Sequence, residues 1–86
     1  MEESRYKGIM EIVENFNPSA LFAEGFDKAI IGYTNGNGPV LPVYDVEKCI
    51  IVLTDSGMNL EEATEYFEYN VLGSYMGENS PIFISL

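Results

Sequence analysis

A glycine-rich turn between two apolar segments limits the folds open to this chain. Residues 35–38 read Asn-Gly-Asn-Gly, and Asn and Gly tolerate the positive φ angles that a tight hairpin turn requires. Residues 29–34 before the turn are β-branched and aromatic, and residues 40–44 after it are also largely apolar. We therefore expect an antiparallel hairpin. The turn matches neither glycine-rich phosphate motif, so we do not interpret it as a phosphate loop.

A proline in the second strand of the hairpin bears on the order of the strands. Pro42 has no backbone N–H to donate, so we expect its strand to lie at a sheet edge or to carry a bulge. Residues 82–84 read Ile-Phe-Ile and predict a last strand after a loop at 78–81. With Pro42 at an edge, this last strand is predicted to pair beside residues 29–34.

The first part of the chain has a helical pattern. Apolar side chains recur at helical spacing over residues 5–16, which predicts an amphipathic helix. Pro18 ends it, because the residue before a proline disfavours the helical conformation. We expect Ser19 to cap a short helical turn within residues 19–26.

Two further helices are predicted after the hairpin. Asp45 is a natural N-cap for a helix over residues 46–54, which Gly57 ends. Asn59 caps a second helix with Glu62 at its third position, a pattern typical of a capping box. This helix is expected to end at Gly73 or one turn later at Gly77. Its predicted buried stripe consists of Leu60, Ala63, Phe67 and Val71.

Length and composition predict one domain. A chain of 86 residues is too short for two domains that fold unaided, and an apolar share of 47% suffices for one core. We expect a single domain over residues 1–86, with a helical segment over 1–25 and the remaining elements over 26–86. The fold class is α+β: a small three-stranded sheet, made of the hairpin and the C-terminal strand, with helices packed on one face.

The charge balance limits the choice of partners. The chain has 14 Asp and Glu residues against 4 Lys and Arg, no His, and a formal net charge of −10. Such a chain repels nucleic acid and anionic membranes and is attracted to basic surfaces. The alternative is that the charge only keeps a small hydrophobic domain soluble.

The residues that carry most enzyme chemistry are missing or unsuited to it. Without His the usual general base is absent, and Cys49 lies on the apolar face of a predicted helix, where a thiol is unreactive. Glu61 and Glu65 would lie on an exposed helix face, where the surroundings do not adapt a carboxylate to acid–base catalysis. We predict no catalytic residue and no cofactor.

A metal site is not expected either. Four oxygen donors bracket the turn between the two later helices, but their spacing does not follow that of a calcium loop, and capping explains two of them. They are Asp55, Asn59, Glu61 and Glu62.

The compartment is expected to be the cytoplasm. A single cysteine excludes an intramolecular disulfide, and the polar, acidic first residues do not resemble a secretory signal. The longest apolar run, residues 49–53, is too short to span a bilayer.

A row of carboxylates on the last predicted helix is the main candidate for a binding surface. Glu61, Glu65 and Glu68 recur at i, i+4 and i+7, which places them on one stripe away from the buried side. Like charges at this spacing cost about 0.2–0.5 kcal/mol per pair. The helix dipole favours acidic residues in the first turn but does not account for those beyond it. Two interpretations remain open, a solvated face and a surface for a basic partner.

Tyrosines beside the stripe fit the second interpretation, because interfaces that face Arg and Lys often pair tyrosine with carboxylate. The predicted partner-binding residues are Glu61, Glu62, Glu65, Glu68, Tyr66 and Tyr69.

Four stretches together resemble a known group of proteins. They are residues 26–32 (Phe-Asp-Lys-Ala-Ile-Ile-Gly), 44–50 (Tyr-Asp-x-x-Lys-Cys-Ile), 62–73 (Glu-Ala-x-Glu-Tyr-Phe-Glu-Tyr-Asn-Val-Leu-Gly) and 77–84 (Gly-Glu-Asn-Ser-Pro-Ile-Phe-Ile). From Phe26 onward the chain resembles a group of small acidic proteins encoded by bacteriophages and some prokaryotic genomes. The resemblance implies a phage-like origin and a cytoplasmic setting, and it brings no activity and no functional residues with it.

The sequence thus leads to two expectations about function. In size, charge and implied origin the chain is similar to anti-CRISPR and anti-restriction proteins, which occupy the nucleic-acid site of host defence proteins. We expect a non-enzymatic inhibitor that mimics nucleic acid by presenting its carboxylates to a basic protein surface. The alternative is a structural or assembly subunit that acts as a homodimer, with the charge serving solubility only.

Overall fold

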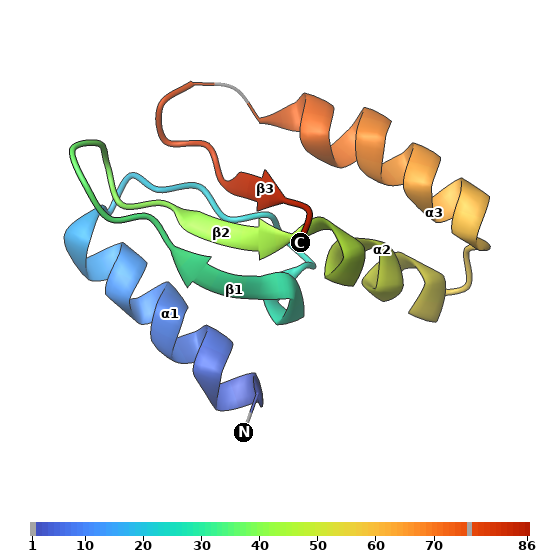
Figure 1. The fold of residues 1–86 in the computed structure, drawn as a ribbon, viewed down its shortest axis with the longest axis horizontal. Helices are drawn as coiled ribbons and strands as arrows, with labels where there is room; N and C mark the ends of the chain where they lie inside the picture. The colour runs from blue at the N-terminus through green and yellow to red at the C-terminus, as the bar shows by residue number, and fades with distance from the viewer. Residues whose placement is uncertain (1, 76) are drawn as a thin grey trace.

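The computed structural model describes residues 2–75 and 77–86 and has an α+β architecture. Its main elements in chain order are α1 (Glu2–Phe16), β1 (Ile30–Tyr33), β2 (Pro42–Asp45), α2 (Val46–Asp55), α3 (Leu60–Tyr66) and β3 (Ile82–Ile84), as Figure 1 shows. Three short helical segments complete them: η1 (Asp27–Ala29), the π-helical η2 (Phe67–Val71) and η3 (Leu72–Ser74). The predicted fold class, with a small three-stranded sheet, is confirmed.

The strand order differs from the prediction. β2 lies in the middle of the sheet, antiparallel to β1 and parallel to β3. The prediction failed because Pro42 is the first residue of β2 and lies opposite Tyr33, whereas β3 begins its pairing opposite Val43. A proline at the start of a strand removes no hydrogen bond from the rest of the ladder, so a central strand tolerates it there.

The hairpin forms as predicted, but its connection is wider than a tight turn. Only Gly36 in this loop has a positive φ, so the two asparagines do not adopt the left-handed conformation. The side-chain hydroxyl of Thr34 closes the loop: it donates to Pro39 O at 3.1 Å and accepts from Leu41 N at 2.9 Å. β1 is therefore one residue shorter at each end than predicted, whereas β2 begins two residues later than predicted and ends one residue later, at Asp45.

The short helical turn expected within residues 19–26 is not present. Phe26 N donates to Ala23 O at 3.1 Å, but two other backbone N–H groups of this segment donate to distant parts of the chain. Leu21 N donates to Asn79 O at 3.0 Å, and Ala23 N donates to the hydroxyl of Tyr44 at 2.8 Å. A single helical turn has little stability of its own, so these long-range hydrogen bonds determine the conformation.

A chain of aromatic rings joins the helical half of the molecule to the sheet. The ring of Phe67 meets Phe83 edge-on at a centroid distance of 5.4 Å and meets Phe26 edge-on at 6.4 Å. Phe83 in turn stacks on Tyr44 at 5.3 Å. Edge-to-face and offset-stacked pairs at these distances are favourable beyond their burial. The core therefore runs from η1 through η2 to β3 and β2.

The buried side of the last helical region depends on the π-helical segment. Ala63, Phe67 and Val71 are all buried and follow one another at steps of four residues. In a regular α-helix such a stripe drifts by about 40° per step. In η2 the N–H of Leu72 donates to Phe67 O, five residues back, and this wider turn lessens the drift. Both apolar side chains of η2 therefore keep facing the core.

Leu60 does not belong to this buried stripe, contrary to the prediction, because it is 68% exposed. It is the first residue of α3, and this end of the helix lies farthest from the sheet in Figure 1. The spacing of apolar residues places it on the correct side of the helix, but the core does not extend that far.

The predicted N-cap of α2 is confirmed. The carboxylate of Asp45 accepts from Glu47 N at 3.0 Å and caps α2. Cys49 of this helix is fully buried, and its burial, with Asp45 nearby, raises the pKa of its thiol to about 12. A thiol that stays protonated at neutral pH is a poor nucleophile, so the structure gives Cys49 a place in the core.

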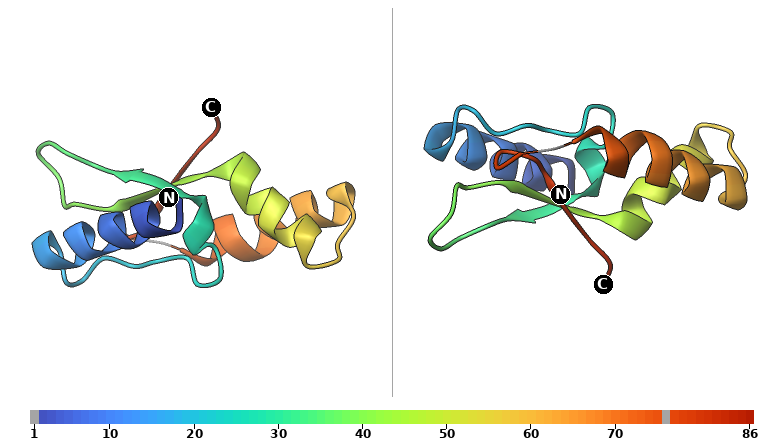
Figure 2. Two further views of the ribbon diagram at one scale, coloured as in Figure 1. Left: turned by 90° about the horizontal axis from the view of Figure 1, so that it is seen from below. Right: turned by 90° about the horizontal axis from the view of Figure 1, so that it is seen from above.

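The sheet is covered on one side only. Figure 2 shows α1, α3 and the segment that follows α1 on one side of the strands, and the opposite face is turned toward the viewer in Figure 1. Because Tyr44 and Phe83 point into the core, Val43, Ile82 and Ile84 point to the opposite face. The described part of the chain places no helix over these three residues.

Replacement of Tyr44 by phenylalanine tests the link between the sheet and the segment after α1. Tyr44→Phe keeps the ring but leaves the buried N–H of Ala23 without its acceptor. We expect the free energy of unfolding to fall by about 1–3 kcal/mol, measured by urea denaturation. Tyr69→Phe, at a position that is 78% exposed, should change it by less than about 0.5 kcal/mol. Equal effects of both replacements would contradict this account.

Candidate functional site

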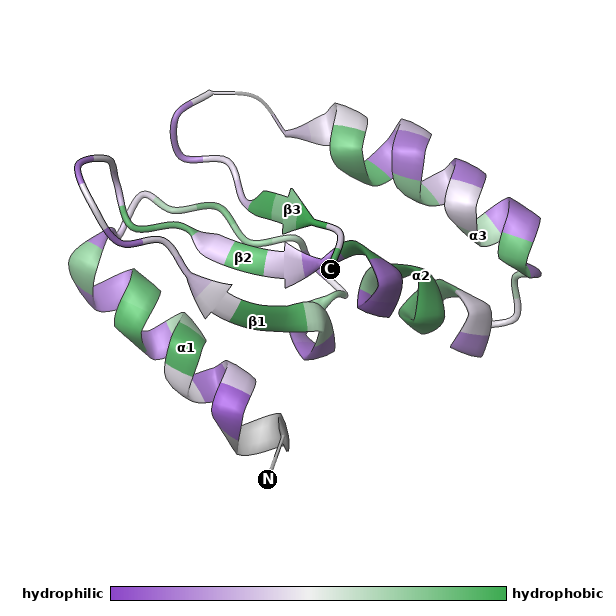
Figure 3. Ribbon diagram, in the orientation of Figure 1, coloured by the Kyte–Doolittle hydropathy of each residue, from purple (hydrophilic) through white to green (hydrophobic). Residues whose placement is uncertain are grey.

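The acidic face of α3 is formed as a continuous exposed surface. This face comprises Glu61, Glu65 and Glu68, all of which are exposed. α3 passes into η2 without a break, so Glu68 continues the line of the two preceding carboxylates. Figure 3 shows hydrophilic residues recurring along this helix. Among the side chains that the structure describes, none forms an ion pair with these three carboxylates.

Glu62 has a different role from its neighbours. Its carboxylate accepts from Asn59 N at 3.1 Å, and the side chain of Asn59 accepts from Glu62 N at 2.8 Å. This reciprocal pair is the predicted capping box and satisfies two N–H groups at the start of α3. Glu62 was predicted as a partner-binding residue, and its side chain is exposed, but helix capping already accounts for it.

The two tyrosines named with the acidic face are accessible. Tyr69 is 78% exposed and Tyr66 is 42% exposed. Each side chain has a flat ring and a hydroxyl, and side chains of this kind contribute contact area at protein interfaces with little loss of conformational entropy. The structure thus places all six predicted partner-binding residues on one helical region at the surface, and their role in binding stays a prediction.

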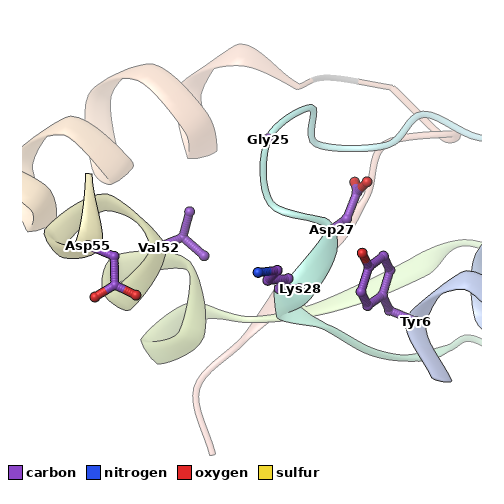
Figure 4. A pocket seen from close by; sticks show the side chains of 6 residues that line it. All are labelled: Tyr6, Gly25, Asp27, Lys28, Val52 and Asp55. Carbon is purple, nitrogen blue, oxygen red and sulfur yellow. The ribbon is translucent and has the colours of Figure 1, made fainter. Parts of the chain in front are cut away.

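A cavity of about 390 Å³ opens between α1, η1 and α2. Its lining residues are shown in Figure 4 and comprise Tyr6, Gly25, Asp27, Lys28, Val52 and Asp55. Tyr6 and Asp27 lie on one side of Lys28 in this view, and Val52 and Asp55 lie on the other. Its volume is within the range of small-molecule sites, about 300–1,000 Å³.

The side chains that line the cavity can make hydrogen bonds of several kinds. Its carboxylates can accept hydrogen bonds, the phenol of Tyr6 can donate or accept one, and Lys28 can only donate. Among the side chains that the structure describes, those of residues 5–75 and 77–86, no group of three or more Asp, Glu or Cys could hold a metal ion. The single thiol lies in the core, away from this cavity.

Sequence reasoning did not identify this cavity. Its lining comes from three segments that are far apart in the chain, and the segment carrying Gly25 was expected to be helical. The only signal in the sequence was the carboxylate of Asp55 at the end of α2, where the helix dipole disfavours a negative charge. Capping does not explain this residue, and it could have been singled out on that ground.

The described helices include none that is both long and apolar enough to cross a membrane. Comparison of the chain with protein-family models, with curated proteins and with solved structures found no match.

Alanine replacements at two glutamates of α3 distinguish a residue that stabilises the helix by capping from a residue of the acidic face. Glu62→Ala should lower the free energy of unfolding by about 0.5–1.5 kcal/mol, because a hydrogen bond of the capping box is lost. Glu65→Ala should leave it unchanged or raise it by about 0.2–0.5 kcal/mol, because repulsion between like charges is relieved. Urea denaturation measures both. A loss of stability at Glu65 as large as that at Glu62 would show that the acidic face has a structural role.

Proposed function

We propose that this chain is a non-enzymatic binding protein whose acidic face engages a basic surface on another protein. One observation carries the proposal: Glu61, Glu65 and Glu68 project together from a folded helix with no cationic partner among the described side chains. Their mutual repulsion is mildly unfavourable to folding, and contact with Lys and Arg side chains of a partner would relieve it.

The chemistry of the face favours one class of partner. Basic surfaces that bind nucleic acid are arranged to contact rows of phosphates, and a row of carboxylates on a rigid helix offers them a similar pattern of negative charge. The net charge of −10 would speed association with such a surface. We propose a host nucleic-acid-binding protein, such as a defence protein, as the target, with the chain acting as an inhibitor of the anti-CRISPR or anti-restriction kind.

A phage-type origin and a cytoplasmic setting belong to the same proposal. Support for the setting comes from the single cysteine, which is buried and reduced in the fold. Nucleic-acid-binding defence proteins act in the host cytoplasm, so inhibitor and target would share one compartment.

Affinity capture with a matched pair of double variants tests the role of the acidic face. The intact chain is used to capture proteins from a bacterial lysate at about 50 and about 300 mM salt, and the captured proteins are identified by mass spectrometry. We expect a basic, nucleic-acid-binding protein whose retention falls as salt rises, because screening weakens exposed charge pairs. That protein should also release its nucleic acid when the chain is added.

The double variant Glu65→Gln/Glu68→Gln should lose most of the captured protein. The control Glu11→Gln/Glu14→Gln removes the same charge from exposed positions of α1 and should retain it. Capture that does not weaken with salt, or that both double variants weaken equally, would count against the proposal.

A second candidate function, that of an assembly subunit, is favoured by the uncovered face of the sheet. Val43 and Ile82 lie side by side in neighbouring strands, with Ile84 two residues further along β3. None of these residues is charged, so two copies could pack face to face here without bringing carboxylates together. Burial of such a face against a second copy would stabilise a domain of this size.

The oligomeric state decides this candidate. If it is correct, multi-angle light scattering should give twice the 9.6 kDa of one chain. Ile82→Asp should then yield monomers, because two buried carboxylates would meet across the contact. The control is Ile51→Asp, at a position of α2 that is 49% exposed. A monomer at every concentration, or dissociation by both replacements, would exclude an interface at this face.

A further inference from the structure

A second, smaller cavity gathers most of the positive charge of the molecule. It has a volume of about 110 Å³ and is lined by Arg5 from α1, Lys28 from η1 and Lys48 from α2, with Ile30 and Ile31 of β1 beside them. These are three of only 4 Lys and Arg residues in the whole chain. Three separate elements therefore bring their cations to one place, although like charges repel.

In the described part of the chain, the charged residues that line this cavity are all cations, opposite in sign to the net charge of the molecule. Among the side chains that the structure describes, no carboxylate forms an ion pair with Arg5 or Lys48. A chain that used its few cations only to moderate its net charge would spread them among its carboxylates. Their convergence on a cavity is instead typical of a site that receives an anion.

The small cavity is adjacent to the larger one, because Lys28 lines both of them. In the larger cavity, Lys28 lies between Tyr6 and Asp27 on one side and Asp55 on the other (Figure 4). The two ends thus differ in chemistry: one attracts negative charge, and the other accepts hydrogen bonds and repels negative charge.

We propose that the two cavities form one binding site for a small phosphorylated polyol, such as a sugar phosphate. The phosphate group would lie between Arg5, Lys28 and Lys48, where the guanidinium can make two parallel hydrogen bonds and each ammonium contributes a point charge. The volume there equals that of about three to four water molecules, which suits a phosphate group. A phosphate group fits better than a carboxylate, because its oxygens point in several directions and can contact cations from three sides.

The larger cavity would hold the uncharged part of the ligand. Asp55 and Asp27 can accept hydrogen bonds from hydroxyl groups, and Val52 offers apolar contact to the carbon skeleton. Both carboxylates would repel a second phosphate, so they fix the orientation of the ligand. The site also accounts for Asp55, whose negative charge at the C-terminal end of α2 is unfavourable for the helix. This proposal does not depend on the function proposed for the acidic face of α3.

An NMR titration of the full chain with ribose 5-phosphate tests the site. We expect the amide signals of Arg5, Tyr6, Lys28, Lys48 and Asp55 to shift together, with a Kd of about 0.1–1 mM. Inorganic phosphate should shift only the signals at the cationic end, and unphosphorylated ribose should bind more weakly than ribose 5-phosphate. The absence of shifts at these residues would overturn the proposal.

Two pairs of matched variants assign the roles of the two ends. Lys48→Gln should weaken binding of ribose 5-phosphate about tenfold, because a charge-assisted hydrogen bond is lost. Lys7→Gln removes the same charge from the fourth cation, which is exposed and lines neither cavity, and should leave the affinity within about twofold. Arg5→Gln gives a second test of the cationic end in case Lys48→Gln does not fold.

Asp55→Asn should weaken binding of ribose 5-phosphate at least about threefold but not that of inorganic phosphate, because only the sugar reaches this end of the site. Its charge-matched control is Glu65→Gln, on the acidic face of α3, which should change neither affinity. Equal effects of Lys48→Gln and Lys7→Gln would show that the ligand is attracted only by positive charge in general and is not bound specifically at the cationic end. An Asp55→Asn variant that binds ribose 5-phosphate normally would exclude the larger cavity. Either result would overturn the proposal.

Discussion

The contact of Phe67 with the rings of Phe26 and Phe83 is the interaction on which the rest of the structure depends. Phe67 is 1% exposed and lies where the helical half of the molecule meets the sheet. Helices as short as α2 and α3 are marginal by themselves, so packing of this kind provides most of their stability. The π-helical turn of η2 supports this packing, since it lets Phe67 and Val71 face the core together. This packing also determines the position of the acidic face: because one side of the helix is held against the core, the opposite side is exposed to solvent.

Two groups of like charges occur on the molecule, although Asp27 and Asp55 lie with Lys28 around the larger cavity. The carboxylates of α3 project from one helix without cations, while Arg5, Lys28 and Lys48 gather at a cavity beside β1. Stability at the surface would favour interspersed charges of both signs, because opposite charges nearby attract. This grouping of like charges is therefore not explained by folding. It is explained if one surface meets a cationic partner and the other an anionic one, which is why the two proposals concern different places on the molecule.

Much of the fold could be predicted from local signals, and the failures have physical reasons. The capping box at Asn59 and the hairpin between β1 and β2 were predictable because each depends on residues close in sequence. The strand order was not, since a proline excludes a strand from the centre only if its missing N–H faces a neighbour, and Pro42 lies just outside the pairing with β3. The acidic face could be predicted from spacing alone. The cavities could not, because their lining comes from three elements that only tertiary packing brings together.

The polar residues of both proposed sites are separable from the core, which makes function and stability distinguishable. In the part of the chain that the structure describes, Asp45 is the only buried charged residue, and it is used as the N-cap of α2. The core beneath the acidic face and beneath the cavities is made of apolar and aromatic side chains. Replacement of Glu65, Glu68 or Lys48 therefore leaves no cavity and no buried group unpaired, which are the usual causes of a large loss of stability. A binding defect at either site in a variant with native stability would thus report on recognition itself.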